Sequence, residues 1–218
     1  MRPPLVTSRK NRVATVPDPR LQFDPTALGL SQFSRDFFRH DTVIVAQAII
    51  GSWFARRCRG QWHGARIVET EAYLGAMDAA AHSWRGRRTP RVEPMYEDGG
   101  HLYVFLVYGM HSCANVVTRP TGVAEAVLLR AAEGPEGTPA RLLSGPGKFC
   151  AALGITVAAS GVDLLSGGDL RLFRGDGTID IGISKRIGVE YAGEAADWPL
   201  RFFDKNSASV SGPLRLRA

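Results

Sequence analysis

Two glutamates and a tyrosine alternate within the stretch RIVETEAYLG at Arg66–Gly75. In an extended strand every second side chain lies on the same face, so we expect Glu69, Glu71 and Tyr73 side by side. A carboxylate in an aromatic-lined, partly desolvated site can act as a general base on water. The pattern therefore indicates acid–base chemistry, although a single glutamate on a strand is far more often a surface residue.

The loop that follows, residues 75–94, is long and carries a histidine and a tryptophan among its arginines. Loops of this length inside a compact domain are usually functional. Aromatic faces can stack on a base that has left a duplex, while histidine or asparagine hydrogen-bonds its edge. Arginines can hold the phosphates, and an exposed aromatic at a hairpin tip, such as Tyr108, can fill the gap. Together these residues favour a nucleic-acid partner.

Several other chemistries lack their motifs. The turn SGPGK at Ser144–Lys148 resembles part of a phosphate-binding loop, but Leu142 and Phe149 stand where a Walker sequence needs Gly and Ser or Thr. The turn is therefore either a simple helix cap or a contact between backbone N–H groups and a phosphate. HExxH, GxSxG and HxE with PCxxC do not occur, which excludes the usual zinc hydrolases, serine hydrolases and zinc deaminases.

Composition is that of a soluble globular domain, and its positive charge indicates either a polyanionic partner or a protein that is simply basic. The 218 residues include 27 Lys+Arg against 21 Asp+Glu, a net charge of +6, and only four of the basic residues are lysine. An arginine excess suits phosphate recognition. With 44% hydrophobic and 22% charged residues, the chain is neither collagen-like, nor a disulfide-dense scaffold, nor wholly disordered.

Cysteine usage and hydropathy bear on location. Three widely spaced cysteines without a CxxC pair indicate a reducing compartment and no zinc site. The longest apolar stretches are too short to span a bilayer, and the N-terminus lacks the apolar region of a signal peptide. We therefore expect a cytoplasmic protein, associated with the nucleoid in a bacterium and nuclear otherwise.

Apolar patterns predict helices at residues 42–50, capped by Asp41, and from Ser144 to about residue 153. A turn is expected at residues 59–64, and strands are expected at residues 52–58, 65–73, 101–108, 112–118 and 125–131. Residues 1–25 form a basic, proline-containing and irregular tail, and residues 26–218 form one domain. From these patterns alone the fold is mixed α+β.

The chain closely resembles the alkyladenine (3-methyladenine) DNA glycosylase family of base-excision repair from about residue 31 to about residue 203. The matching motifs lie in the same order with compatible spacing: RIVETEAYLG at 66–75, AAAHS at 79–83, RTPR at 88–91, LYVFLVYGM at 102–110, AVLLRA at 126–131 and SGPGK at 144–148. The resemblance implies a single α+β domain with a curved, mostly antiparallel β-sheet and peripheral helices.

The resemblance also implies roles for individual residues. Glu71 matches the family's general base, which activates water for attack on the anomeric carbon, and Arg130 matches the arginine that helps to place this water. Walls of the flipped-base pocket are implied at Tyr73, His82, Phe105 and Asn115. Residues that fill the hole in the duplex are implied at Tyr108 and Met110. Contacts to the DNA backbone are implied at Arg88, Thr89, Arg91, Ser144, Gly145 and Lys148.

The implied activity is that of a monofunctional DNA glycosylase, a hydrolase acting on N-glycosyl bonds. Its substrate is double-stranded DNA with damaged purines of the 3-methyladenine, hypoxanthine and ethenoadenine class. A bifunctional enzyme needs an amine nucleophile for a Schiff base, and the four lysines have no such motif context. We expect no metal, no organic cofactor, no membrane and no obligate protein partner, and the expected state is a monomer.

Two other functions fit parts of the pattern. A non-catalytic DNA-binding module that recognises lesions or distortions would use Tyr108 and the arginines without releasing a base; the intact Glu71 and Arg130 argue against it. A helix-hairpin-helix glycosylase is suggested only by the GPG sequence at 145–147. That class needs two helices around the hairpin, whereas a Gly/Pro-rich loop precedes Ser144.

The chain departs from the family pattern at three places. Phe105 stands where relatives commonly have tyrosine, so stacking is kept and any hydroxyl contact is lost. Val92, Glu93 and Pro94 follow the RTPR motif where asparagine is usual, and Glu93 brings a negative charge close to the expected phosphates. The segment between residues 130 and 144 is shorter than in some relatives, which removes surface and leaves the chemistry unchanged.

Overall fold

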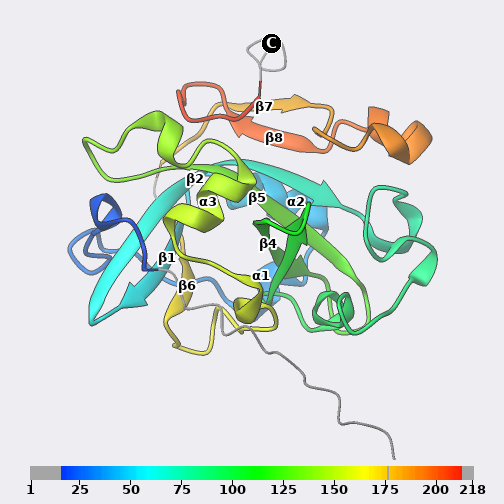
Figure 1. Cartoon of the computed structure of the whole chain (residues 1–218), viewed down its shortest axis with the longest axis horizontal. Coiled ribbons are helices and arrows are strands. Elements are labelled where there is room, and N and C mark those ends of the chain that lie inside the picture. Colours follow the sequence, from blue (N-terminus) through cyan, green and yellow to red (C-terminus); the bar gives the residue numbers. More distant parts are fainter. Residues whose placement is uncertain (1–15, 176, 213–218) are drawn as a thin grey trace, which may run out of the picture.

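The strand that carries both glutamates, β2 (Gln61–Tyr73), runs through the middle of an antiparallel sheet (Figure 1). The computed structural model describes residues 16–175 and 177–212. β2 pairs along one edge with β5 (Glu125–Glu133) and along the other with β1 (Trp53–Cys58) and then β8 (Arg201–Asp204). The other described strands extend this sheet: β3 (Leu102–Val107), β4 (His111–Thr118), β6 (Leu170–Phe173) and β7 (Ile181–Ser184).

Short helices pack against the sheet and close its core. Asp41 caps α2 (Thr42–Ala48) by accepting the Val43 N–H at 2.9 Å. α3 (Pro146–Ala152) starts with a proline in its first turn and contacts β4 and β5. The described chain also contains α1 (Arg35–Phe38) and 3₁₀ segments at Pro19–Leu21, Gly75–Met77, Trp84–Gly86, Glu93–Tyr96, Ala140–Leu142, Val157–Ala159 and Glu190–Asp197.

The main core lies between these helices and the sheet. Its fully buried members include Phe38, Ile49, Phe54, Ile67, Leu129 and Phe149. Leu21 is fully buried in the same core, and Gln22 forms an isolated β-bridge with His63. The packing of the domain therefore begins before the predicted boundary at residue 26. The predicted tail at residues 1–15 lies outside the described residues.

The predicted α+β fold with a curved, mostly antiparallel sheet is confirmed. The predicted strands correspond to β1–β5 and the two predicted helices to α2 and α3. The turn predicted around residues 59–64 is present but shorter, because Arg59 (φ 51°) and Gly60 (φ 79°) alone connect β1 to β2. Positive φ at both positions suits a two-residue type I′ hairpin, so β2 begins at Gln61.

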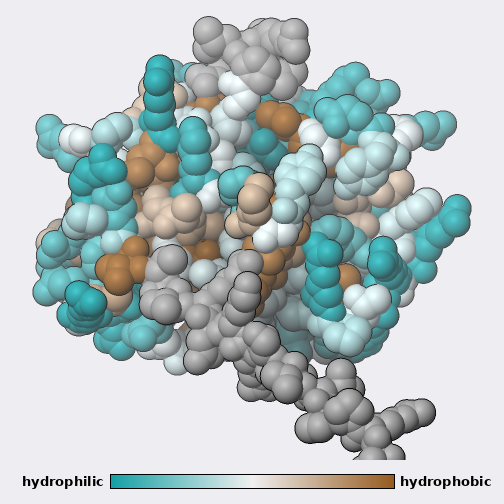
Figure 2. All heavy atoms as spheres, viewed as in Figure 1, coloured by the Kyte–Doolittle hydropathy of each residue, from teal (hydrophilic) through white to brown (hydrophobic). Residues whose placement is uncertain are grey.

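The surface of the molecule shows where polar and apolar residues gather. In the orientation of Figure 1, hydrophilic side chains cover most of the periphery, and apolar residues gather nearer the middle, around α3 and β4 (Figure 2). No helix within the described residues is long and apolar enough to cross a membrane.

Candidate active site

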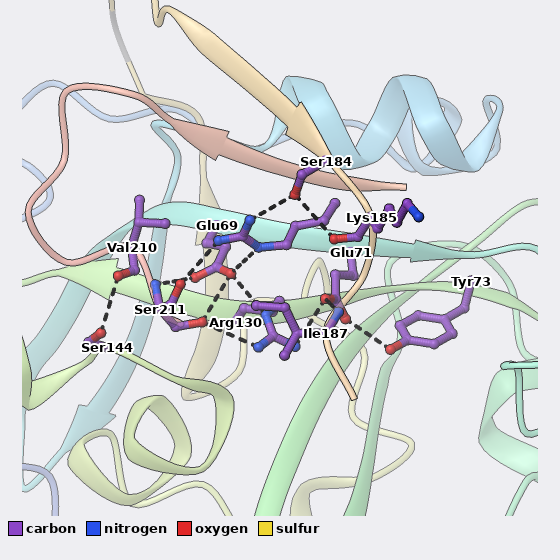
Figure 3. A network of polar contacts seen from close by, with 11 residues as sticks. Glu69, Glu71, Tyr73, Arg130, Ser144, Ser184, Lys185, Ile187, Val210 and Ser211 are labelled. Carbon is purple, nitrogen blue, oxygen red and sulfur yellow. Dashed lines mark hydrogen bonds and ion pairs between the residues drawn. The ribbon is translucent and has the colours of Figure 1, made fainter. Parts of the chain in front are cut away.

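Glu71 lies near the end of β2, and its side chain is fully buried. The Tyr73 hydroxyl donates to Oε2 at 2.9 Å, the Ile187 N–H donates to Oε1 at 2.7 Å, and Arg130 Nη1 lies 3.1 Å from Oε1 (Figure 3). A buried carboxylate is stable as an anion only with partners of this kind. The site therefore holds an oriented anionic acceptor in contact with an arginine.

Arg130 reaches this carboxylate because the β2–β5 ladder is irregular. Ala131 lies opposite Glu69, and Leu129 lies opposite Thr70, the next residue of β2. Arg130 is therefore the extra residue of a β-bulge. Bulges redirect a side chain relative to the regular strand pattern. As a result the guanidinium contacts Glu71 through Nη1 and Glu69 through Nε, the latter at 3.0 Å.

Arg130 stays charged in this buried position. Burial disfavours the charged guanidinium, but the charges of Glu71 and Glu69 outweigh it and raise the pKa of Arg130 above its usual range. Glu69 is fully buried too, and it also accepts the Nε–H of Arg201 at 2.7 Å. Two carboxylates and two guanidiniums therefore balance one another's charge, as a buried cluster requires.

A cavity of about 490 Å³ opens beside Arg130 and Ile187. Cavities of this size take small aromatic ligands, and a purine base falls within that range. The four residues predicted as walls of a base pocket all line the cavity, and they come from β2, the loop after it, β3 and β4: Tyr73, His82, Phe105 and Asn115. The fold thus gathers them around one space next to the Glu71–Arg130 pair.

Tyr73 is held on two sides. Its hydroxyl donates to Glu71, and the Arg186 guanidinium lies 4.8 Å from its ring centroid. Arg186 is fixed in turn by a buried two-pronged ion pair with Asp78, with its Nη2 2.9 Å from Oδ1. Burial and the charge of Glu71 raise the pKa of Tyr73, so its hydroxyl remains a donor. These contacts make the ring a rigid wall.

His82 presents a neutral ring to the cavity. It lies edge-on to Phe105 with ring centroids 4.4 Å apart, and its Nδ1 is 2.8 Å from the Tyr103 hydroxyl. Burial, together with the charges of Arg91 and Arg87, lowers the pKa of His82 to about 4. Burial raises the pKa of Tyr103 to about 12, so at pH 7 the imidazole is neutral and the phenol keeps its proton.

Tyr108 and Met110 stand at the tip of the β3–β4 hairpin, where they are 88% and 70% exposed. The Met110 N–H donates to the Val107 carbonyl at 3.1 Å and closes the turn. Tyr108 adopts φ 50° and Gly109 φ 68°; for a tyrosine this left-handed backbone costs about 1–3 kcal/mol. Tyr108 also lines the rim of the cavity. A strained, exposed aromatic in this place is typical of a functional tip.

The two arginines of the RTPR motif differ in their surroundings. Arg91 lines the cavity, with its guanidinium 5.7 Å from the Phe105 ring centroid. Arg88 is exposed and donates to both carboxylate oxygens of Glu93, through Nε at 2.9 Å, while it lies 4.4 Å from the Tyr96 ring centroid. Glu93, the acidic residue that follows the RTPR motif, is therefore paired with an arginine predicted to contact a phosphate.

The other predicted backbone contacts lie at Thr89 and in the turn before α3. Thr89 is half-buried, and its carbonyl accepts two backbone N–H groups of the following turn. The Ser144 hydroxyl donates to the Val210 carbonyl at 3.5 Å, Gly145 adopts φ 124°, and Lys148 is exposed. Pro146, which lies between Gly145 and Lys148, lines the cavity, so this turn borders the same opening.

Comparison with known proteins places these residues in a family. Residues 36–208 match the family model of methylpurine-DNA glycosylase (MPG). The chain belongs to the methylpurine-DNA glycosylase family. A protein of Desulfitobacterium hafniense (strain Y51), named "Putative 3-methyladenine DNA glycosylase", is 42% identical over 201 residues, which cover 84% of this chain and 99% of that one. A protein of the same name from Methanocella arvoryzae is 42% identical over 81% of this chain and 94% of its own length. Another from Bdellovibrio bacteriovorus is 43% identical over 81% of this chain and 97% of its own length.

Membership of the methylpurine-DNA glycosylase family makes this protein a hydrolase that acts on N-glycosyl bonds in DNA. The resemblance drawn from the sequence motifs is confirmed. Within residues 16–175 and 177–212, no cluster of three or more His, Cys, Asp or Glu side chains could hold a metal ion.

Tyr103 is a site residue that the sequence analysis did not single out. It is buried, lines the cavity, contacts His82 and accepts the Asn115 Nδ2–H at its carbonyl at 3.1 Å. It lies two residues before Phe105 on β3, so the two-residue period of a strand could have placed both side chains on one face.

Ile187 and Tyr191 also belong to the site, and the sequence analysis assigned a role to neither of them. Ile187 contacts Glu71 through its backbone N–H, which is independent of its residue type. Tyr191 is 72% exposed, lines the cavity and donates from its hydroxyl to the Ala80 carbonyl at 3.3 Å. Both arrive from the segment after β7, so only the folded chain brings them to β2.

Proposed function

We propose that this protein is a monofunctional glycosylase that removes 3-methyladenine and other alkylated or deaminated purines from double-stranded DNA. The 3-methyladenine specificity is suggested by the names of its relatives. The observation that carries the proposal is the contact of 3.1 Å between Arg130 and Glu71 beside a cavity lined by aromatic rings. This arrangement pairs a base for water with a compartment for a purine.

In the proposed reaction, a water molecule held by Glu71 and Arg130 attacks C1′ of the flipped nucleotide. Glu71 accepts a proton from the water, the oxygen bonds to C1′, and the N-glycosidic electron pair leaves with the purine. A cationic base such as 3-methyladenine departs as a neutral molecule. A neutral base such as hypoxanthine needs a proton as it leaves.

The walls of the pocket would select the base. A purine stacks on the rigid ring of Tyr73 and meets His82 and Phe105 on other sides, while Asn115 crowds the exocyclic amine of guanine. In the tautomer in which the Tyr103 hydroxyl donates to Nδ1 of the neutral His82, the imidazole Nε2–H is left to donate to an acceptor of the base. Oxygen O6 of hypoxanthine is an acceptor of this kind.

The rim of the cavity would hold the DNA. Tyr108, with Met110 beside it, fills the gap that the flipped nucleotide leaves in the stack. Backbone contacts come from the RTPR loop and from the turn before α3, through Arg88, Thr89, Arg91, Ser144, Gly145 and Lys148. The protein acts as a monomer in the compartment that holds the DNA.

Single-turnover base release tests this function. End-labelled duplexes with one 3-methyladenine, hypoxanthine or ethenoadenine are incubated with the wild type and with Glu71→Gln, and abasic sites are cleaved by alkali. We expect strand breaks that need both alkali and Glu71, with the variant slower by about 10²-fold or more and equal in DNA affinity. Binding without base release by the wild type would favour a lesion-recognition module instead.

A further inference from the structure

The buried ion cluster behind Arg130 continues into the chain after β8. We use the name C-terminal strap for residues Lys205–Gly212. The strap passes close to the cluster, and Ser211 is buried within it, with only 4% of its surface exposed. The Ser211 contacts are drawn in Figure 3, where they lie on the side of Arg130 opposite Tyr73.

Each nitrogen of the Arg130 guanidinium contacts a different side chain. Nη1 lies 3.1 Å from Glu71 Oε1, Nε donates to Glu69 Oε1 at 3.0 Å, and Nη2 donates to the Ser211 hydroxyl at 3.3 Å. The guanidinium is planar, so contacts in these directions fix both its position and its rotation. The contacts of Nε with Glu69 and of Nη2 with Ser211 therefore fix the position of Nη1 next to Glu71.

Ser211 connects those two contacts. Its hydroxyl accepts from Arg130 and donates to Glu69 Oε1 at 3.0 Å, while its backbone N–H donates to Glu69 Oε2 at 2.6 Å. Its carbonyl accepts the Nη2–H of Arg201 at 3.1 Å. The strap is thus tied to the cluster through the backbone on both sides of the Ser211 side chain.

We propose that Ser211 is a positioning residue of the glycosylase, which acts through Arg130 and with Glu69 to hold Nη1 against Glu71. This inference rests on the proposed function of Glu71 and Arg130. It makes Ser211 alone, of the residues of the C-terminal strap, a part of the active site, although the strap contributes no lining residue to the cavity. Without the hydroxyl, Nη2 loses its acceptor and the guanidinium can rotate away from the water site.

The same strap offers a matched control. The Ser207 hydroxyl is also buried and donates to a carboxylate, Glu133 Oε1, at 2.5 Å. Glu133 pairs with Arg66 and has no contact with Arg130. Ser207→Ala removes the bond to Glu133 and the bond that the Ser207 hydroxyl accepts from the Ser209 N–H, and Ser211→Ala removes the bonds to Glu69 and Arg130. Each variant loses two hydrogen bonds of a buried serine and is expected to lower Tm, but only the second alters the contacts of Arg130.

The experiment measures the single-turnover rate of base release and the Kd for an uncleavable lesion duplex for both variants and for Ser211→Thr, which keeps the hydroxyl. We expect Ser211→Ala to slow release by about tenfold or more with an unchanged Kd. Ser207→Ala should keep the wild-type rate, and Ser211→Thr should recover most of it. Glu69→Gln, which keeps the shape of the side chain, should slow release at least as much as Ser211→Ala.

Each result decides the question. Equal rates for Ser211→Ala and Ser207→Ala overturn the proposal, and so does a Ser211→Thr variant that folds and is as slow as Ser211→Ala. A wild-type rate for Glu69→Gln overturns it as well, independently of the serine variants. If the wild type releases no base from any duplex, the proposed function fails instead, and this is seen before any variant is compared.

Discussion

His82 combines burial with neighbouring positive charge, and this has a consequence for stability. Its folded-state pKa of about 4 lies below the ordinary value of 6.5. Between these two pH values the unfolded chain binds a proton that the folded chain does not. The contribution of His82 to the free energy of unfolding is therefore fully present above about pH 6.5 and is lost as the pH falls towards 4.

We expect the unfolding free energy of the wild type to fall on acidification from pH 6.5 to 4.5 more steeply than that of His82→Gln. The difference in slope from one group is at most about 1.4 kcal/mol per pH unit. Urea denaturation of both proteins at several pH values measures it. Parallel slopes would mean that His82 is protonated in the folded protein near pH 6, which would also remove its proposed role as a neutral donor to the base.

At the scale of elements, the β3–β4 hairpin holds Tyr108 in a backbone conformation that tyrosine disfavours, at φ 50°. The side chain is 88% exposed, so packing does not compensate for this strain. Asparagine tolerates the left-handed region much better. We therefore expect that function, and not stability, explains the presence of tyrosine at position 108.

Tyr108→Asn is accordingly expected to be as stable as the wild type or more stable by about 1 kcal/mol. The same variant should release the damaged base about tenfold more slowly or worse, because the gap in the duplex is no longer filled. Urea denaturation and single-turnover release measure the two effects. A destabilised variant would show that Tyr108 packs within the protein, and an unchanged rate would exclude the proposed insertion.

The elements also show how far the sequence predicts the site. The alternation of Glu69, Glu71 and Tyr73 and the hairpin at Tyr108 follow from strand periodicity, and the residues expected to line a pocket do line one. The direction of the Arg130 side chain does not follow from strand periodicity, because it depends on a β-bulge within the apolar run AVLLRAA, and no residue type in this run indicates a bulge.

Other parts of the site depend on contacts between distant segments. Periodicity shows which face of β2 is covered but not which segment covers it. The backbone N–H of Ile187 and the hydroxyl of Ser211 reach the glutamates of β2 across 116 and 142 residues. Neither residue type, read in its own sequence neighbourhood, indicates a catalytic centre, so only the folded chain assigns them to it.

At the scale of the whole molecule, the net charge of +6 attracts DNA, and surface ion pairs decide which arginines are available to it. Arg88 is bound by Glu93 in the free protein. Exposed pairs of this kind contribute little to stability, so the carboxylate mainly competes with phosphate for the guanidinium. We therefore expect Glu93 to weaken the proposed contact between Arg88 and a DNA phosphate without altering the fold.

Glu93→Gln should bind lesion DNA more tightly and with a steeper salt dependence. Each additional phosphate contact steepens the slope of log K against log salt by about 0.9, so a change of about one is expected. Asp180→Asn is the matched control, because it frees Lys205 in the same way and adds the same charge. Titrations at several salt concentrations separate the two explanations. A steeper slope for Glu93→Gln alone places Arg88 on a phosphate, whereas equal changes in both variants would mean that only the overall charge acts and that Arg88 makes no contact of its own.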